Sequence, residues 1–429
     1  MNIHIHTFGC RLNQYESEKI SFELKNMGAN ITELKNADAI AINTCTVTND
    51  SDKKLINYLD KLENISQKKI FLIGCYVSKK ENIIKENSKE ENLFDKENIT
   101  IIPNDKKEEA SQIIFNTLTK NYESEFKNPI FFPQEQSRAY LKIQDGCEVF
   151  CSYCIVARVR GKHKSVEPKK IYDAIKIAYE YGYKEIVLTG LNLGSYNYNN
   201  EIKFIQIVKN MLEISSKFGI RIRLSSIEPI YFNDELISLF KNSEVLCPHA
   251  HIPLQSGSDK ILKLMNRRYT RENYLNIVEK LYKTNSNIGI SADIMVGFPN
   301  EDSNDFKDTY NLCEKSKFIK MHIFRYSNRE NTPSSKMSNQ IGYRTKLKRA
   351  KLLNELNNKM KVDFYKNAIN RELKVIAEKK LENNYYIGTS GEYLKVKFKS
   401  EKIIEKKDII KVKAIKYEYN IIIGEAKNG

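Results

Sequence analysis

Along the first 125 residues, short apolar runs alternate with stretches in which apolar positions recur at helical spacing. Three apolar runs predict strands, at residues 3–8, 39–43 and 70–73. The stretches after them predict helices, at residues 14–27, 50–62 and 108–118. The segment 78–98 is rich in Lys, Glu and Asn, which is typical of a solvated helix or loop. Because alternating strands and helices form parallel sheets with right-handed crossovers, we expect an α/β domain over residues 1–125.

A second series of apolar runs begins after residues 128–133, whose sequence Asn-Pro-Ile-Phe-Phe-Pro is typical of a linker. Six runs predict strands, at residues 140–143, 185–189, 220–225, 249–253, 288–294 and 319–324. The stretches between them predict helices, at residues 168–181, 204–217, 271–283 and 305–316. Six strand–helix units predict a partial (β/α)6 barrel over residues 133–365, smaller than the closed eight-unit form.

From residue 366 the pattern changes to short alternating strands without long helices. Five strands are predicted, at residues 373–377, 385–388, 393–398, 409–415 and 420–423. Residues 366–429 contain 15 Lys and Arg against 9 Asp and Glu, a net charge of +6. Five tyrosines are expected to be exposed there: Tyr385, Tyr386, Tyr393, Tyr417 and Tyr419. Small basic barrels with exposed aromatic rings bind RNA, so we predict an RNA-binding all-β barrel, with a plain structural domain as the alternative.

The net charge of the whole chain indicates the kind of partner that it binds. The 429 residues carry a formal net charge of +16 with a pI of about 9.2, which suits a polyanion such as nucleic acid. Abundant Lys, Asn and Ile offer a compositional explanation instead. No apolar run reaches the roughly 18–20 residues of a membrane span, and the N-terminus lacks a signal-peptide pattern. We expect a cytoplasmic protein without a membrane partner, whose thiols stay reduced.

Three of the eight cysteines follow the predicted strands of the first domain. Cys10, Cys45 and Cys75 each come just after an apolar run. Ligands of parallel sheets lie beyond the carboxyl ends of the strands, so these thiols can converge despite their distance in sequence. Three thiolates can hold an iron–sulfur cluster with one iron left open for chemistry. The alternative is that each is a small buried apolar residue.

Three further cysteines form a tight group, Cys147, Cys151 and Cys154, with C-x3-C-x2-C spacing. They come just after the first predicted barrel strand, at the end where barrel active sites lie. A closed zinc site would need a fourth ligand, and the nearest His, His163, is flanked by lysines. The spacing therefore predicts a second iron–sulfur cluster with an open iron.

Polar residues and glycines follow the later barrel strands at the same rim. Thr189, Gly190 and Asn192 follow the second strand, and glycine lets the backbone approach a bound molecule. The next three strands are followed by Ser226 and Glu228, by His251 and Gln255, and by Gly297. Each motif alone also occurs in ordinary turns. Four in succession on one rim indicate a cofactor site.

The cysteine group with Tyr153 before its last member resembles the radical S-adenosylmethionine enzymes. Within that superfamily the chain resembles the methylthiotransferases over nearly its whole length, through the segments 7–17, 43–48, 74–75, 251–258, 267–270 and 296–299. The C-terminal barrel matches the position of their TRAM domain, an RNA-binding module. The sequences at 13–16, 223–229 and 324–327 are similar to the branch that acts on threonylcarbamoyladenosine.

This resemblance implies an enzyme that places a methylthio group on carbon 2 of threonylcarbamoyladenosine, next to the tRNA anticodon. It implies S-adenosylmethionine and two 4Fe-4S clusters as cofactors: one cofactor molecule would methylate sulfur on the auxiliary cluster, and a second would supply a 5′-deoxyadenosyl radical. The resemblance assigns the radical cluster and its catalytic role to Cys147, Cys151 and Cys154, and the auxiliary cluster to Cys10, Cys45 and Cys75. It assigns cofactor contacts to Tyr153 and the rim residues.

One segment departs from the family pattern. Residues 157–161 read Ala-Arg-Val-Arg-Gly where Pro-Tyr-Ala-Arg-Gly is usual, which affects the expected substrate contacts, including the roles of Arg158 and Arg160, rather than the reaction. Cys247 and Cys313 match no ligand position and are expected to be packing residues. The sequence identifies neither the reducing electron donor nor the sulfur source.

Three other functions are open at this point. A sister enzyme uses isopentenyladenosine at the same tRNA position, and a cation for the threonyl carboxylate would separate the two. The candidates for that cation are Arg221, Arg223, Arg325 and Arg329. A branch that modifies a ribosomal-protein aspartate fits less well with residues 255–258 and the basic barrel. A non-catalytic iron–sulfur RNA-binding protein would need no cofactor rim.

Overall fold

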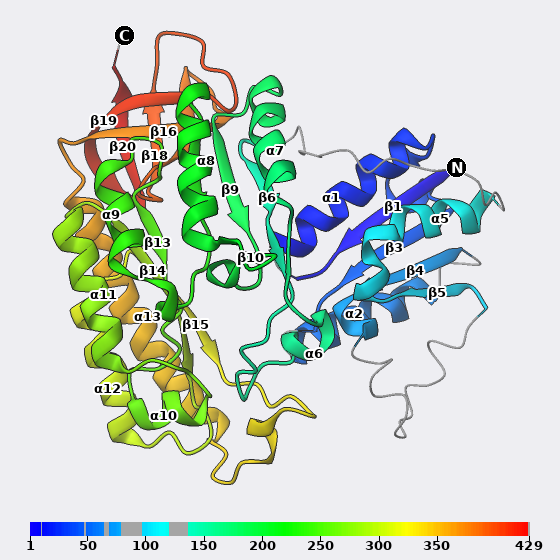
Figure 1. Cartoon of the computed structure of the whole chain (residues 1–429), viewed down its shortest axis with the longest axis horizontal. Coiled ribbons are helices and arrows are strands. Elements are labelled where there is room, and N and C mark those ends of the chain that lie inside the picture. Colours follow the sequence, from blue (N-terminus) through cyan, green and yellow to red (C-terminus); the bar gives the residue numbers. More distant parts are fainter. Residues whose placement is uncertain (10, 47–48, 64–67, 79–96, 120–135, 428–429) are drawn as a thin grey trace. The chain divides into compact units, whose positions relative to one another are not determined.

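The computed structural model describes residues 1–9, 11–46, 49–63, 68–78, 97–119 and 136–427. They pack into two compact units (Figure 1). The first contains residues 1–133 with the segments 145–163 and 327–335, and the second contains residues 134–144, 164–326 and 336–429. The predicted linker at 128–133 and most of the polar segment 78–98 lie outside the described residues.

The first unit is built on a five-stranded parallel sheet with the order β2-β1-β3-β4-β5. Its strands are β1 (Asn2–Thr7), β2 (Asn30–Ile31), β3 (Ala39–Thr44), β4 (Lys69–Gly74) and β5 (Ile99–Ile102). Its main helices are α1 (Arg11–Asn26), α2 (Asn49–Glu63) and α5 (Ala110–Thr119). The predicted α/β architecture is therefore confirmed.

Strand alternation gives this sheet two apolar faces. Ile3, Phe71 and Ile73 face one side and pack with apolar residues of α1 and α5. Ile40 and Leu72 face the other side and pack with α2. Successive side chains of a strand point to opposite faces of the sheet. A sheet that is covered on both faces therefore needs strands that are apolar at every position. The loops at the ends of the strands are left free to carry chemistry.

The second unit contains the six predicted barrel strands, in two three-stranded parallel sheets with the orders β6-β9-β12 and β13-β14-β15. Isolated bridges from Ile222 to Leu246 and from Ser226 to His251 connect the two sheets. The strands are β6 (Ala139–Lys142), β9 (Glu185–Thr189), β12 (Arg221–Leu224), β13 (His249–His251), β14 (Gly289–Val296) and β15 (Lys320–Arg325). The partial barrel is confirmed, and every strand end lies within two residues of the predicted position.

Helices lie outside these strands (Figure 1). They are α7 (Pro168–Glu180), α8 (Phe204–Phe218), α9 (Asp234–Asn242), α10 (Asp259–Leu264), α11 (Arg271–Thr284), α12 (Ser303–Ser316) and α13 (Tyr343–Lys366). The 24-residue helix α13 was not predicted, because its many charged residues leave a weak apolar stripe. It packs along β15 and leads into the C-terminal strands. Cys247 and Cys313 are buried here, as expected of packing residues.

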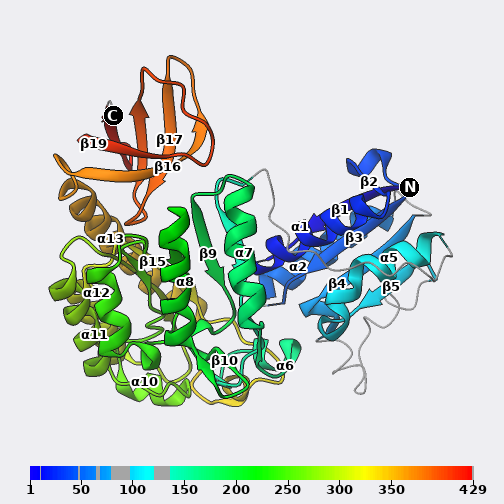
Figure 2. The ribbon, with the colours of Figure 1, turned by 45° about the horizontal axis from the view of Figure 1, so that its top comes forward.

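The C-terminal strands close into a barrel with the order β16-β17-β18-β20-β19. They are β16 (Glu372–Lys380), β17 (Tyr385–Ser390), β18 (Lys395–Lys399), β19 (Ile409–Glu418) and β20 (Ile421–Ala426). Figure 2 shows β16, β17 and β19 of this barrel. The predicted five-stranded barrel is confirmed, but the tyrosines differ from expectation. Tyr386 is buried, Tyr393 stacks on His249 and Tyr417 packs against Tyr365, whereas Tyr419 is 96% exposed.

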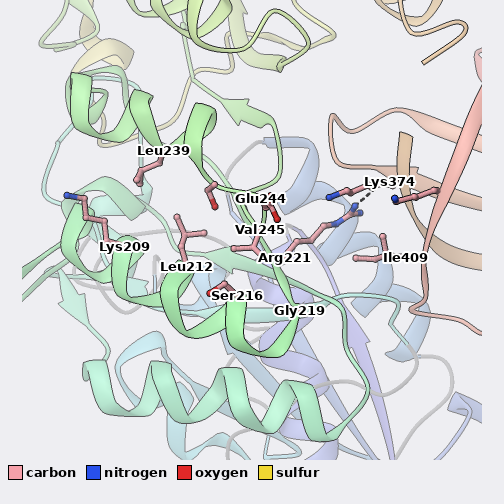
Figure 3. Close-up of a pocket in the computed structure, with 12 residues that line it drawn as sticks. Lys209, Leu212, Ser216, Gly219, Arg221, Leu239, Glu244, Val245, Lys374 and Ile409 are labelled. Atoms are coloured by element: carbon pink, nitrogen blue, oxygen red, sulfur yellow. Dashed lines mark hydrogen bonds between the residues drawn. The ribbon is translucent and has the colours of Figure 1, made fainter. Parts of the chain in front are cut away.

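Buried charges join the C-terminal barrel to the amino ends of the partial-barrel strands. Glu185 is fully buried and accepts hydrogen bonds from Nε of Arg221 at 2.6 Å and from Nε of Arg223 at 2.7 Å. Arg221 also donates to the carbonyl of Lys374 at 2.7 Å, and Arg223 donates to the carbonyl of Gly391 at 2.9 Å. Figure 3 shows Arg221 pointing to β16 from the wall of a cavity of about 720 Å³.

The expectation that Arg221 or Arg223 binds a substrate carboxylate is therefore wrong. Both side chains are buried and already pair with Glu185 and with carbonyls of the C-terminal barrel. They lie at the end of the strands that serves stability in barrel folds. Within the described residues, none of the helices is long and apolar enough to cross a bilayer.

Candidate functional site

The carboxyl ends of the first sheet bring cysteines together. Thr44 of β3 and Gly74 of β4 are register partners, so Cys45 and Cys75 follow neighbouring strand ends. Cys10 itself lies outside the described residues, but Gly9 before it approaches closely: a Cβ at Gly9 would lie 2.8 Å from Sγ of Cys45. Gly9 has φ of +104°, which only glycine adopts easily. The ends of β1, β3 and β4 thus lie side by side in the sheet, and the convergence of the three thiols stays a prediction.

The same glycine–cysteine pair recurs before Cys75 and Cys147, whereas Thr44 precedes Cys45. Gly74 before Cys75 has φ of +98°, and Gly146 before Cys147 has φ of +73°. A Cβ at Gly74 would lie 3.0 Å from Nζ of Lys107, and a Cβ at Gly146 would lie 2.0 Å from the carbonyl oxygen of Lys162. This repeated glycine is a signal that the sequence contains and that reasoning from cysteine spacing alone did not use.

Cys75 lies in a buried basic environment. The guanidinium of Arg160, from α6 (Val156–Arg160), donates from Nε to Sγ of Cys75 at 3.3 Å. Glu16 accepts from Nη1 of Arg160 at 2.6 Å and also forms an ion pair with Lys107. Burial by itself would lower the pKa of Arg160, but the charges of Glu16, Cys75 and Asp145 raise that pKa well above its ordinary value. The guanidinium is therefore permanently charged beside the thiol.

A second arginine reaches the loop after Cys45. Arg329, from the segment 327–335, donates from Nη2 to the carbonyl and the hydroxyl of Thr46, both at 2.6 Å. It also pairs with Asp52 at 2.8 Å. Arg329 was one of the candidate cations for a substrate carboxylate. Its partners make it a residue that holds the Cys45 loop.

The C-x3-C-x2-C group forms a compact loop within the first unit. The amide of Cys154 donates to the carbonyl of Cys151 at 3.0 Å, and the amide of Cys147 donates to the carbonyl of Gly161 at 3.3 Å. Burial raises the pKa of the Cys154 thiol to about 12, and the neighbouring Cys151 and Cys147 raise it as well. A buried thiol such as that of Cys154 binds as a thiolate only when a cation compensates its charge, so this donor set suits iron. Tyr153 lies within the same loop.

The second unit positions the predicted rim residues at the carboxyl end of β9. Oγ1 of Thr189 and Oδ1 of Asn192 are buried without a hydrogen-bond partner among the described residues. A Cβ at Gly190 would lie 2.9 Å from Oε1 of Gln144, which accepts from the amide of Asn192 at 2.8 Å. Buried polar atoms are normally paired, so two open acceptors at one strand end fit a bound polar molecule.

Charged residues gather at the carboxyl ends of the other strands of the partial barrel. Glu228 forms an ion pair with Arg267, which is 8% exposed. Burial raises the pKa of Glu228, although Arg267 partly opposes that rise. Nε2 of His251 lies 3.2 Å from Oδ2 of Asp293, and His322 packs edge-on against the His251 ring. Asp293 begins the motif that contains Gly297, whereas His322 was not singled out from the sequence. Its position on β15, opposite Asp293 of β14, could have indicated a rim residue.

The remaining rim residues, Ser226, Gln255 and Gly297, make backbone contacts that hold the strand ends. Ser226 bridges to His251. The amide of Gln255 donates to the carbonyl of Asp293 at 2.8 Å, and Gln255 has φ of +63°. The amide of Gly297 donates to Glu301 at 2.9 Å, and Lys346 packs where a Cβ would stand. Their cofactor contacts stay predictions.

Comparison with known proteins adds a family to this geometry. A model of the radical SAM superfamily matches residues 141–313, and a model described as uncharacterized protein family UPF0004 matches residues 2–96. The chain is 34% identical to the threonylcarbamoyladenosine tRNA methylthiotransferase MtaB of Bacillus subtilis, over 97% of this chain and 94% of that protein. The MtaB of Thermotoga maritima is 33% identical, over 94% and 92%. The chain belongs to the radical SAM tRNA methylthiotransferase family.

Other relatives in this family carry a different name. A tRNA-2-methylthio-N(6)-dimethylallyladenosine synthase of Clostridium tetani is 36% identical, over 89% of this chain and 86% of that protein. Among solved structures, the radical S-adenosylmethionine methyltransferase TsrM of Kitasatospora setae has a TM-score of 0.56, with 10% identity and coverage of 78% and 76%. That likeness concerns the fold alone.

Membership of the family makes the chain a radical SAM enzyme with S-adenosylmethionine and two 4Fe-4S clusters as cofactors. The described residues fit these groups. The loop with three thiols suits one cluster, the sheet edge with Cys45 and Cys75 suits the other, and the open acceptors after β9 suit a polar cofactor.

Proposed function

We propose that this chain converts threonylcarbamoyladenosine next to the anticodon of tRNA to its 2-methylthio derivative. The observation that carries the proposal is the full-length match: relatives named for this activity align over 91–97% of the chain, across every predicted domain. The relatives named for the dimethylallyl substrate align over 79–91%. The three-domain division at 1–125, 133–365 and 366–429 belongs to the same proposal.

Each group of residues has a separate task in this proposal. Bound 4Fe-4S clusters and S-adenosylmethionine supply the reductive cleavage of a sulfonium and the methylthio group. Cys147, Cys151 and Cys154 anchor the cluster that meets the cofactor, close to Tyr153. Cys10, Cys45 and Cys75 anchor the auxiliary cluster. Thr189 and Asn192 accept hydrogen bonds from the cofactor, because their buried oxygens are open to a donor.

The partial-barrel rim orients the cofactor and the adenine. Glu228 is held by Arg267 and offers a carboxylate to hydroxyl or ammonium groups. His251 is held at Nε2 by Asp293 and at Nδ1 by Ser291, so it fixes the Asp293 carboxylate at the rim beside the base. Gly190 and Gly297 allow backbone to come close, and Ser226 and Gln255 set the path of the strand ends.

The partner is tRNA, and the C-terminal barrel binds the phosphates of the tRNA. Lysines on the outward face of β19 are exposed, at Lys411, Lys413 and Lys416. Tyr419 at the following turn is 96% exposed and offers a ring for base stacking. A protein that acts on tRNA and has no membrane-spanning helix among its described residues is expected to work in the cytoplasm.

The isopentenyladenosine reaction is the second candidate, because the highest identity cited above, 36%, belongs to a relative named for the dimethylallyl substrate. Nucleoside analysis of tRNA from a strain lacking this gene separates the two. Loss of 2-methylthio-threonylcarbamoyladenosine alone supports the main proposal. Loss of the 2-methylthio-isopentenyl nucleoside alone supports the second, and loss of neither contradicts both.

A paired substitution tests the division of labour between the cysteines. Cys45→Ala should still cleave S-adenosylmethionine to 5′-deoxyadenosine under reductant but should give no methylthio product. Cys151→Ala should abolish both reactions. If the Cys45 variant still makes methylthiolated tRNA, Cys45 is no ligand of the auxiliary cluster.

A further inference from the structure

The two cysteine groups are joined within the first unit by one side chain. Arg160 ends helix α6, six residues after Cys154 of the C-x3-C-x2-C group. Its Nε donates to Sγ of Cys75 at 3.3 Å, and Cys75 directly follows strand β4. Ile155 and Val159 of the same segment pack on Cys75 with their apolar side chains. A single short helix therefore carries a cluster ligand just before it and touches a ligand of the other group.

The guanidinium of Arg160 is fixed by partners on both sides. Its side chain is 3% exposed. Nη1 donates to Oε1 of Glu16 at 2.6 Å and to Oδ2 of Asp145 at 3.4 Å, and Nη2 donates to Oδ1 of Asn13 at 2.8 Å and to Oε2 of Glu16 at 3.2 Å. With Nε used by Cys75, each nitrogen of the planar fork has an acceptor. Such a fork holds its direction, because rotation would break several charge-assisted hydrogen bonds together.

Two basic side chains, Lys107 and Arg160, lie near the sulfur of Cys75. Lys107 is buried and pairs with Glu16, the carboxylate that also holds Arg160. Lys107 and Arg160 therefore converge on one buried carboxylate, although burial lowers the pKa of Lys107. The carboxylate of Asp145, the second acidic partner of Arg160, is 24% exposed. A negatively charged cluster bound to Cys75 would therefore accept an N–H from a buried guanidinium, and buried charges are stable when they are paired.

We propose that Arg160 is a positioning residue that ties the two cluster sites together and stabilises the reduced form of the auxiliary cluster through its hydrogen bond to Cys75. The inference rests on the proposed assignment of Cys75 to that cluster. Hydrogen bonds to ligand sulfurs and nearby charge set the reduction potential of iron–sulfur clusters. Reduction adds one negative charge to the cluster, and the fixed guanidinium favours that charge.

The test is a redox titration of the reconstituted full chain, in which electron paramagnetic resonance measures the reduced fraction of each cluster. The cluster whose signal changes on adding S-adenosylmethionine is the internal reference, and the other is the auxiliary cluster. Arg160→Met should lower the ratio of reduced to oxidised auxiliary cluster about tenfold at a fixed potential, which is 59 mV for a one-electron couple. Arg160→Lys keeps the charge but not the fork, and should give a smaller fall in the same direction.

Arg158 provides the matched control, because it lies two residues earlier on the same helix and is exposed. Arg158→Met should leave the ratio for the auxiliary cluster unchanged. Unchanged ratios in both Arg160 variants, or an equal fall in Arg158→Met, would overturn the proposal. If Arg160→Met fails to assemble iron, Arg160→Lys decides alone by the same criterion. A natural chain that holds only the S-adenosylmethionine-responsive cluster would refute the two-cluster assignment itself.

Discussion

Replacement of Glu185 by Gln should destabilise the second unit severely. The Glu185 carboxylate is fully buried and is shared by Arg221, Arg223 and Arg138, with the Arg138 Nε 3.0 Å away. The Gln amide has nearly the same shape, but it removes the negative charge and presents an N–H group to an arginine N–H. Three arginines would then keep only neutral carbonyls and Glu378, which pairs with Arg138.

The magnitude follows from the burial. Removing one partner of a buried ion pair costs about 3–5 kcal/mol, because the charge left behind has lost its compensation. For a domain of a few hundred residues, each kcal/mol lowers Tm by about 2–4 °C, so the expected drop is at least about 6 °C. The assay is urea and thermal unfolding followed by circular dichroism, without oxygen. Arg221 and Arg223 also hold carbonyls of the C-terminal barrel, so both barrels should loosen together.

The control is Glu213→Gln, since Glu213 is 73% exposed and pairs with Lys217 one helical turn away. Its effect should stay within about 0.5 kcal/mol. The pH dependence of stability gives a second check of the role of Glu185. Burial by itself would raise the pKa of Glu185, but the three arginines hold it far below its ordinary value. This stabilisation is therefore present above the unfolded pKa of about 4.3 and is lost as the pH falls, and the Gln variant should lack that loss. A cost below about 1 kcal/mol would refute the reasoning.

Three further predictions concern the clusters and the RNA surface. The triple variant Cys147→Ala, Cys151→Ala, Cys154→Ala should hold half the iron and sulfide of the natural chain, and equal amounts would contradict separate clusters. Replacing Lys411, Lys413 and Lys416 by Gln should weaken tRNA binding and reduce its salt dependence, by a slope of about 0.7–0.9 per lost phosphate contact; an unchanged slope in filter binding would place the RNA elsewhere. Gly74→Ala should lose the auxiliary cluster, measured as iron content, because its Cβ would press on Lys107 and Asn43. Gly28→Ala has a similar φ but open space around it and should keep both clusters.

The sequence by itself predicted the architecture well, because each element has a local signature. Runs of four to seven residues predicted three strands of the parallel sheet and the strands of both barrels, and cysteines next to those runs predicted a ligand edge. Thr44 and Gly74 are register partners, so Cys45 and Cys75 do follow neighbouring strands. The helix α13 lacked a strong apolar stripe and was not predicted, since its packing on β15 depends on a partner surface rather than on its own periodicity.

Side-chain roles that depend on distant partners were decided by the tertiary structure. Tyr386 was predicted to be exposed but is buried, because its side chain points into the interior of the closed barrel. Arg223 looked like a substrate cation until Glu185 and the carbonyl of Gly391, 168 residues away, accounted for it. Arg160 lies 85 residues from Cys75 in the chain, yet donates to its sulfur. Periodicity and spacing report local preference, whereas burial and charge pairing arise only when strands far apart in sequence pack together.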